Sequence, residues 1–235
     1  MIPFSDVNPT RSPAPVNRLL LFVNILVWVY ILNLQRTPGA LDAFFDRYAF
    51  DWSRLTHDLS TGAWTFATFV PLITHMFLHG GWLHIIGNML YLWVFGDNVE
   101  DRLGSGTFLL FYLLCGIVAA VGQGLVAPSP MLGASGAIAG VLGAYLVLSP
   151  GARVKTLIFL GIFITVLQLP AVVVIGFFIV IQFIEGFASL RLPGFAATEQ
   201  VAYFAHLFGF FAGIALLYLL RDRTRRNTPL YGRYG

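Results

Sequence analysis

Two short motifs in this sequence could together perform nucleophilic catalysis. A serine lies among glycines in Gly133-Ala134-Ser135-Gly136, and a histidine follows an alanine in Ala205-His206. Each motif opens a long apolar segment, where a polar or ionisable side chain is costly and therefore indicates function. A serine activated by a histidine is a nucleophile for acyl transfer. The pair predicts an enzyme that carries out acyl transfer within a membrane.

Five glycines accompany these two residues: Gly133, Gly136, Gly140, Gly209 and Gly213. The last two follow His206 by three and seven residues, on one face of a helix. Because glycine lets backbones approach closely, we expect two glycine-faced helices to bring the Ser135 hydroxyl to the His206 imidazole. Each motif alone is also consistent with a structural role, as a small-residue packing face or as a hydrogen-bonded core histidine.

A second polar pair, His84 and Asn88, lies within another apolar segment. A spacing of four residues puts both side chains on one helix face. An imidazole and a carboxamide can both donate hydrogen bonds to a developing oxyanion. We therefore expect these residues to stabilise the oxyanion, the alternative being hydrogen bonds between helices.

The segments that carry Ser135 and His206 contain no acidic residue that could orient the imidazole. The nearest candidates are Glu185 and Glu199, in or near connecting regions. The sequence therefore predicts a Ser–His dyad rather than a triad, which is an accepted variant of serine catalysis.

A metal site is the less favoured interpretation of the remaining histidines. His75 and His79 have a spacing that can present two zinc ligands, but the glutamate of an H-E-x-x-H motif is missing. The single cysteine, Cys115, cannot form an internal disulfide or a cysteine zinc site, and we interpret it as a small core residue. We expect no metal and no cofactor.

The composition is that of an integral membrane protein. Hydrophobic residues make up 57% of the 235 residues and charged residues 11%, against about 25% charged in a soluble domain. The apolar runs are continuous rather than alternating, which argues against a transmembrane barrel and predicts an all-α membrane bundle.

Six segments are predicted as membrane spans of about the required length. They are about 18–34, 83–96, 106–126, 134–149, 170–188 and 202–220. The chain then divides into an N-terminal cytoplasmic segment (1–17), a membrane domain (18–220) and a basic cytoplasmic tail (221–235). The first apolar run is too long for a signal peptide, so we expect it to be retained as a span.

Two connecting stretches have unusual compositions. Residues 36–82 mix acidic, basic and aromatic side chains, which predicts short amphipathic helices lying in the membrane surface. Residues 154–169 are apolar and are followed by Pro170, so they could form a seventh span or a membrane-dipping connection.

The distribution of basic residues favours six spans over seven. With six spans, ten of the 14 Lys and Arg residues lie on the side that holds both termini. Lys and Arg accumulate in cytoplasmic loops, so both termini should be cytoplasmic, in a multi-pass protein that we expect in the plasma membrane of a bacterium. The net charge of +3 comes from a C-terminal cluster and does not indicate a nucleic-acid partner.

Residues 65–220 resemble the rhomboid family of intramembrane serine proteases. The resemblance rests on the stretch from His79 to Asp101 (HGGWLHIIGNMLYLWVFGDNVED), on Gly133-Ala134-Ser135-Gly136 and on Ala205-His206-Leu207-Phe208-Gly209. It implies a six-transmembrane-helix bundle with a membrane-lying first loop. It also implies that the protein is a serine endopeptidase that cleaves the transmembrane segments of protein substrates within the lipid bilayer.

The resemblance also implies roles for individual residues. Ser135 would be the nucleophile and His206 the general base, with His84, Asn88 and the Ser135 backbone N–H as the oxyanion site. One position departs from the family pattern: an aromatic residue often follows the serine by one turn and supports the histidine ring, and here that residue is Ala139. Tyr203 or a residue of the second span could support the ring instead.

Two other functions are compatible with the same features. A non-proteolytic relative could bind membrane helices without cutting them. A small transporter or channel could use His84, Asn88 and His206 as a polar pathway, although it would not need the glycine-flanked serine.

Overall fold

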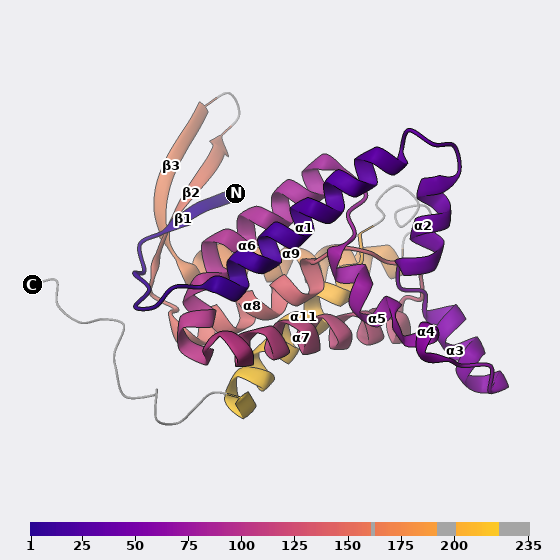
Figure 1. Ribbon diagram of the computed structural model, residues 1–235. Helices are drawn as coiled ribbons and strands as arrows, with labels where there is room; N and C mark the ends of the chain where they lie inside the picture. Colours follow the sequence, from indigo (N-terminus) through magenta and orange to yellow (C-terminus); the bar gives the residue numbers. More distant parts are fainter. Residues whose placement is uncertain (161–162, 192–200, 221–235) are drawn as a thin grey trace, which may run out of the picture.

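Helices make up most of the protein, and the long ones form a bundle (Figure 1). The computed structural model describes residues 1–160, 163–191 and 201–220. The long helices are α1 (Pro15–Leu34), α6 (Trp82–Leu103), α7 (Ser105–Val126), α8 (Ser135–Leu148), α9 (Ala171–Arg191) and α11 (Tyr203–Leu220). These helices occupy the six apolar segments, and the predicted all-α membrane bundle is confirmed.

The lengths of the helices are those of a multi-pass membrane protein. α1, α7, α9 and α11 are each long and apolar enough to cross a membrane. α6 is joined through a bend of 81° to the helical stretch Phe66–Phe77, and the pair would count as a fifth span. α8 is apolar but has only 14 residues, and it contacts α6, α7, α9 and α11.

Residues 36–82 contain short helices that pack at one end of the bundle (Figure 1). They are α2 (Ala40–Tyr48), α3 (Trp52–Thr61), α4 (Phe66–Phe69), α5 (Pro71–Thr74) and the 3-10 helix η1 (His75–Phe77). The Asp51 carboxylate caps α3 by accepting from the backbone N–H of Ser53 (2.8 Å) and of Arg54 (3.2 Å). The predicted short helices are therefore present, and their position in the membrane surface stays a prediction.

The helix of the second predicted span continues beyond residue 96, where that span was expected to end. α6 runs to Leu103, and the chain turns at Gly104, whose φ is +79°. The Glu100 carboxylate accepts from the backbone N–H of Val16 (3.1 Å) and of Asn17 (2.6 Å), in the first turn of α1. A carboxylate at a helix N-terminus satisfies unpaired N–H groups, so this end of α6 holds the start of α1.

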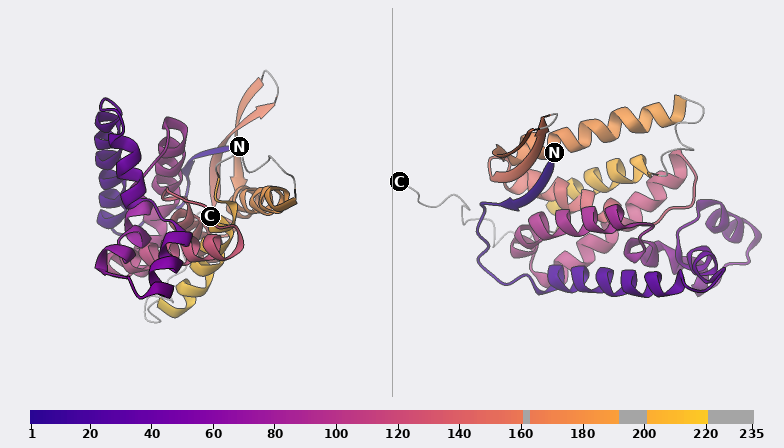
Figure 2. Two further views of the ribbon diagram at one scale, coloured as in Figure 1. Left: turned by 90° about the vertical axis from the view of Figure 1, so that its right-hand side faces the viewer. Right: turned by 90° about the horizontal axis from the view of Figure 1, so that it is seen from above.

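A three-stranded sheet replaces the seventh span that residues 154–169 could have formed. β1 (Ile2–Asp6) pairs with β2 (Arg153–Leu160), which forms an antiparallel hairpin with β3 (Phe163–Pro170). The two hairpin strands are rich in β-branched residues, which favour strands over helices. The sheet lies at the opposite end of the bundle from α3 (Figures 1 and 2). Residues 1–17 thus contribute a strand, while the basic tail (221–235) lies outside the described residues.

Candidate active site

Ser135 is the first residue of α8, directly after a turn that only glycine adopts easily. Gly133 has a φ of +123°, and a Cβ on it would lie 2.5 Å from His84 Nε2 and 3.7 Å from Ser135 Oγ. The His84 ring and the Ser135 hydroxyl therefore flank the same glycine. The Gly133 N–H donates to the carbonyl of His75 (2.8 Å), which holds this turn against the first loop.

The helices that carry Ser135 and His206 are in direct backbone contact. A Cβ on Gly209 would lie 2.0 Å from the carbonyl oxygen of Gly136, and one on Gly213 would lie 2.0 Å from that of Gly140. No larger residue fits at either position without moving the backbone. This close packing of α8 and α11 buries the His206 side chain.

Ser135, His206, His84 and Asn88 all line one cavity of about 1510 Å³. Asn88 is buried, and its Nδ2 has no hydrogen-bond partner among the described residues. A buried donor without a partner is costly unless it serves a bound group. The cavity thus combines a hydroxyl, two imidazoles and an unused amide donor.

The imidazole of His206 is oriented by an amide from a third helix. Its Nδ1 lies 2.5 Å from Gln182 Oε1, on α9, and both residues are buried. A carboxamide oxygen can only accept a hydrogen bond, so this contact selects the tautomer with the proton on Nδ1. In that tautomer Nε2 keeps its lone pair, which is the form that a general base requires.

An aromatic ring from α9 also contacts His206. The ring centroids of Phe178 and His206 are 5.9 Å apart, with the planes tilted by 42°. Ala139 of α8, where the resemblance would place an aromatic residue, is fully buried in the core. From the sequence, Tyr203 or a residue of the second span was a candidate to support this ring, and the structure places Phe178 of the fifth predicted span against it.

Gln123, near the end of α7, holds the beginning of the His206 helix. Its Oε1 accepts from the backbone N–H of Ala205 (3.1 Å), and its Nε2 donates to the carbonyl of Ala127 (2.8 Å). Neither Gln123 nor Gln182 was among the site residues predicted from the sequence. Both are polar residues within apolar segments, which is the same feature that identified His84 and Asn88.

Of the two acidic residues nearest to these segments, only Glu185 lies among the described residues. Gln182 bonds the imidazole one turn before Glu185 on the same helix, and Glu199 lies outside the described residues.

The two histidines considered as metal ligands lie outside a regular α-helix. His75 belongs to η1, and its Nδ1 lies 2.8 Å from the carbonyl of Pro71. His79 precedes α6, and its ring packs edge-on against His84 with centroids 5.0 Å apart. Among the residues that the structure describes, no three His, Cys, Asp or Glu side chains are arranged to hold a metal ion.

Comparison with known proteins identifies relatives over most of the membrane bundle. The model of the Rhomboid domain matches residues 66–223. Rhomboid protease GluP of Bacillus subtilis (strain 168) is 48% identical over 75 residues, which are 32% of this chain and 15% of the relative. Rhomboid-like protein 11, chloroplastic, of Arabidopsis thaliana is 26% identical over 202 residues, which are 84% of this chain and 65% of the relative.

A further relative carries a protease name. Rhomboid protease GlpG of Photorhabdus laumondii subsp. laumondii is 28% identical over 136 residues, 54% of this chain and 48% of the relative. The chain spans less than two thirds of the length of each of these three relatives. The matched Rhomboid domain covers more than half of the chain and contains the serine, both histidines and the asparagine that line the cavity. On these grounds the chain belongs to the rhomboid family.

Proposed function

We propose that this protein is an intramembrane serine endopeptidase that cleaves transmembrane segments, with Ser135 as nucleophile and His206 as general base. One observation carries the proposal: four residues suited to acyl transfer line a single cavity. The contact of Gln182 with His206, which selects the basic tautomer, supports it. The protease names of the relatives support the same activity.

The reaction begins with proton transfer from the serine to the histidine. His206 Nε2 takes the proton of the Ser135 hydroxyl, and Oγ attacks the carbonyl carbon of the scissile peptide bond. The negative charge that develops on the carbonyl oxygen is stabilised by His84, by Asn88 Nδ2 and by the Ser135 backbone N–H. Removal of one such donor costs about 10²- to 10³-fold in turnover in a characterised protease.

The second half of the reaction returns the enzyme to its starting state. The His206 imidazolium protonates the leaving amine, and a water molecule then hydrolyses the acyl-enzyme with His206 again as base. The water must enter through the cavity, since hydrocarbon holds none. A substrate helix must unwind locally to expose its peptide bond, so cleavage should favour small residues such as glycine, which weaken a helix.

The sheet and both termini lie on the cytoplasmic side in this proposal, and the protein resides in the plasma membrane of a bacterium. The first loop, residues 36–82, lies in the opposite membrane surface. Exposed aromatic residues in that loop, Trp64 and Phe66, suit the headgroup region.

A cleavage assay with matched serine variants tests the proposal. The chain is reconstituted in liposomes with a single-span reporter protein, and cleavage is followed on gels. Ser135→Ala should abolish cleavage, whereas Ser60→Ala, at an exposed position in α3, should leave it unchanged. A fluorophosphonate probe should label the wild type and Ser60→Ala but neither Ser135→Ala nor His206→Ala.

Cleavage by Ser135→Ala at the wild-type rate would contradict the proposal. Wild-type protein that binds the reporter but neither cuts it nor reacts with the probe would favour the non-proteolytic function. Ion or solute flux in liposomes without labelling would favour a transporter.

A further inference from the structure

The distal half of the β2–β3 hairpin exposes large apolar side chains. Phe163 is 71% exposed and Ile164 is 62% exposed, and Phe159 and Val166 are each 50% exposed. The strands pair in continuous register from Arg153 opposite Pro170 to the end of β2, so these residues belong to regular structure. Contiguous exposed apolar surface of this kind marks a site of interaction with another surface.

The hairpin is amphipathic along its length rather than across its faces. Near the bundle, one face carries Arg153 and Lys155 opposite Pro170 and Gln168. Towards the tip, the same face carries Phe159 opposite Ile164, because alternate residues of a strand share a face. The hairpin is thus basic where it leaves the bundle and apolar where it ends.

Both faces of the tip are apolar, which indicates what surrounds it. Phe163 and Ile164 are consecutive residues of β3, so they point to opposite faces, and both are exposed. On the face that carries Val154 and Thr156, only the base of β2 is covered by the bundle, because these two residues are fully buried. A protein partner would cover one face of a hairpin, whereas a lipid surface surrounds both.

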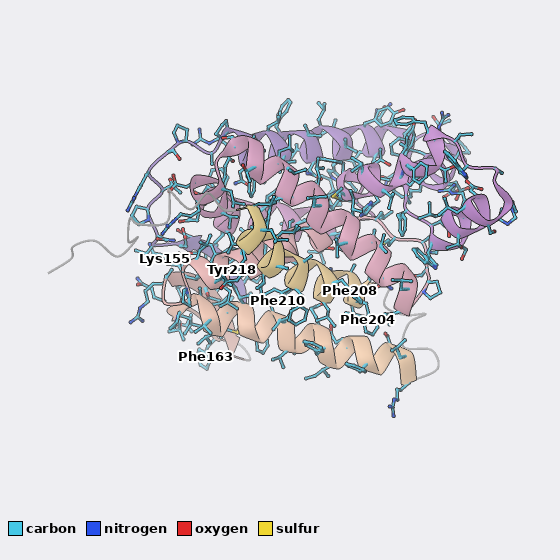
Figure 3. All side chains as sticks on the ribbon, turned by 90° about the horizontal axis from the view of Figure 1, so that it is seen from below. Lys155, Phe163, Phe204, Phe208, Phe210 and Tyr218 are labelled. Carbon is cyan, nitrogen blue, oxygen red and sulfur yellow. The ribbon has the colours of Figure 1, made fainter. Side chains whose placement is uncertain are left out.

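The orientation of the hairpin agrees with a position in the membrane surface. The strands run across the long helices at one end of the bundle rather than parallel to them (Figures 1 and 2). Lys155 and Phe163 lie at the end of the bundle where α9 begins (Figure 3). α9 follows β3 directly and exposes Val172, Val173 and Phe177. The apolar surface of the hairpin therefore continues the lipid-facing surface of a span.

The backbone sets a limit on how deeply the hairpin can enter the bilayer. β3 is at the edge of the sheet among the described strands, and an open edge leaves N–H and C=O groups that need water or headgroups as partners. Such an edge is tolerated at the boundary between headgroups and acyl chains, where an amphipathic anchor inserts by about 5–10 Å. It is not tolerated in the hydrocarbon core.

We propose that the β2–β3 hairpin is an interfacial membrane anchor. Phe159, Phe163 and Ile164 insert among the upper acyl chains, and Arg153 and Lys155 contact anionic lipid headgroups. The anchor is independent of the proposed protease activity, because none of these five residues lines the cavity that contains Ser135.

Site-directed fluorescence in liposomes tests this anchor directly. Cys115 is fully buried, so the parent chain gives the background labelling, and an environment-sensitive thiol dye is attached to Phe163→Cys, Ile164→Cys or Gln168→Cys. Liposomes contain phosphatidylcholine with phosphatidylglycerol. Nitroxide groups on the upper acyl chains should quench the dye at positions 163 and 164 several-fold more strongly than at position 168. Aqueous iodide should quench the dye at positions 163 and 164 several-fold less strongly than at position 168.

The other outcomes overturn the proposal. Equal and strong quenching by iodide at all three positions would place the hairpin in water. Shielding of positions 163 and 164 from both iodide and nitroxide lipids would show that protein covers the tip, either a second copy or a partner. The protease assay is unaffected by these results, since the dye reports only the surroundings of the hairpin.

Discussion

His206 is held by a carboxamide where many serine hydrolases use a carboxylate. Gln182 Oε1 lies 2.5 Å from Nδ1, and Phe178 from the same helix packs against the ring. A neutral acceptor fixes the tautomer without placing a full charge inside the membrane, where an ionised side chain is costly. α9 therefore supplies both groups that position the His206 ring, although it carries neither Ser135 nor His206.

Replacing Gln182 should separate positioning of the base from binding of substrate. Gln182→Leu has a similar size but no acceptor, so turnover should fall by at least about a hundredfold, the lower end of what general base catalysis contributes. KM should be nearly unchanged, because Gln182 is proposed to act on His206 rather than on substrate. Gln182→Glu keeps the acceptor and should recover part of kcat. Steady-state kinetics on the reporter measures both constants. Gln168→Leu, in β3, is the matched control, and an unchanged kcat in Gln182→Leu would refute the positioning role.

Some residues of the candidate site could be predicted from the sequence because their own type and neighbours indicate a function, and others could not. Ser135, His206, His84 and Asn88 stand out because each is polar in an apolar segment and lies in a short motif. Gln182 is also polar in an apolar segment, but nothing in its neighbours indicates which helix it faces. Its partner follows from the way α9 crosses α11, and so does the ring contact of Phe178, which looks like any other apolar residue of a span.

At the scale of elements, the contact between α8 and α11 determines the geometry of the site. The two helices touch through backbone atoms at Gly209 and Gly136 and again at Gly213 and Gly140. Such contacts let the helices pack without intervening side chains, which is a common source of association in membranes. A change in their separation moves Ser135 relative to His206 directly.

Gly209→Ala should therefore lower both stability and activity. Its Cβ would lie 2.0 Å from the carbonyl oxygen of Gly136, so the helices must separate, at a cost of about 1–3 kcal/mol by analogy with overpacked cores. Gly176→Ala in α9 is the matched control, because a Cβ there meets nothing within 4 Å. Thermal unfolding in detergent and reporter cleavage measure the two effects, and equal melting temperatures for the two variants would contradict this account.

The partly buried carboxyl group of Asp6 joins the N-terminal strand to the bundle. Asp6 Oδ2 accepts from the Tyr145 hydroxyl (2.6 Å) and from Asn98 Nδ2 (2.9 Å). Burial raises the pKa of Asp6 from 3.8 to about 6, the Tyr145 hydrogen bond opposes the rise, and the neighbouring Asp97 adds to it. The folded protein therefore retains the Asp6 proton at pH values where the unfolded chain has released it.

This shift predicts that the docking of β1 weakens as the pH rises. The contribution of Asp6 is fully present below its unfolded pKa of 3.8 and is lost as the pH rises through about 6. Asp6→Asn cannot titrate, so the melting temperature of the wild type relative to this variant should fall between about pH 4 and about pH 7. If the melting temperature of the wild type relative to Asp6→Asn stays constant over this range, or rises with pH, the raised pKa of Asp6 is excluded.

At the scale of the whole molecule, the bundle was predictable and the sheet was not. Continuous apolar runs of about 20 residues have few alternatives in a membrane, and each of the six became a helix. Residues 153–170 are also apolar, and periodicity does not distinguish a buried strand from a span in such a run. The β-branched residues of β2 and β3 were the available indication of strands, while the pairing of β1 with β2 joins segments about 150 residues apart and could not be inferred locally.

Thiol labelling from each side of the membrane tests the orientation of the molecule. Val7, which directly follows β1, and Ser60, in α3, are exposed residues. The sheet and α3 lie at opposite ends of the bundle (Figure 1). The excess of Lys and Arg at the sheet end should keep that end cytoplasmic. In intact cells an impermeant maleimide should label Ser60→Cys but not Val7→Cys, and permeabilisation should expose Val7→Cys. Because Cys115 is fully buried, the parent chain serves as the blank, and labelling of Val7→Cys from outside would reverse the proposed topology.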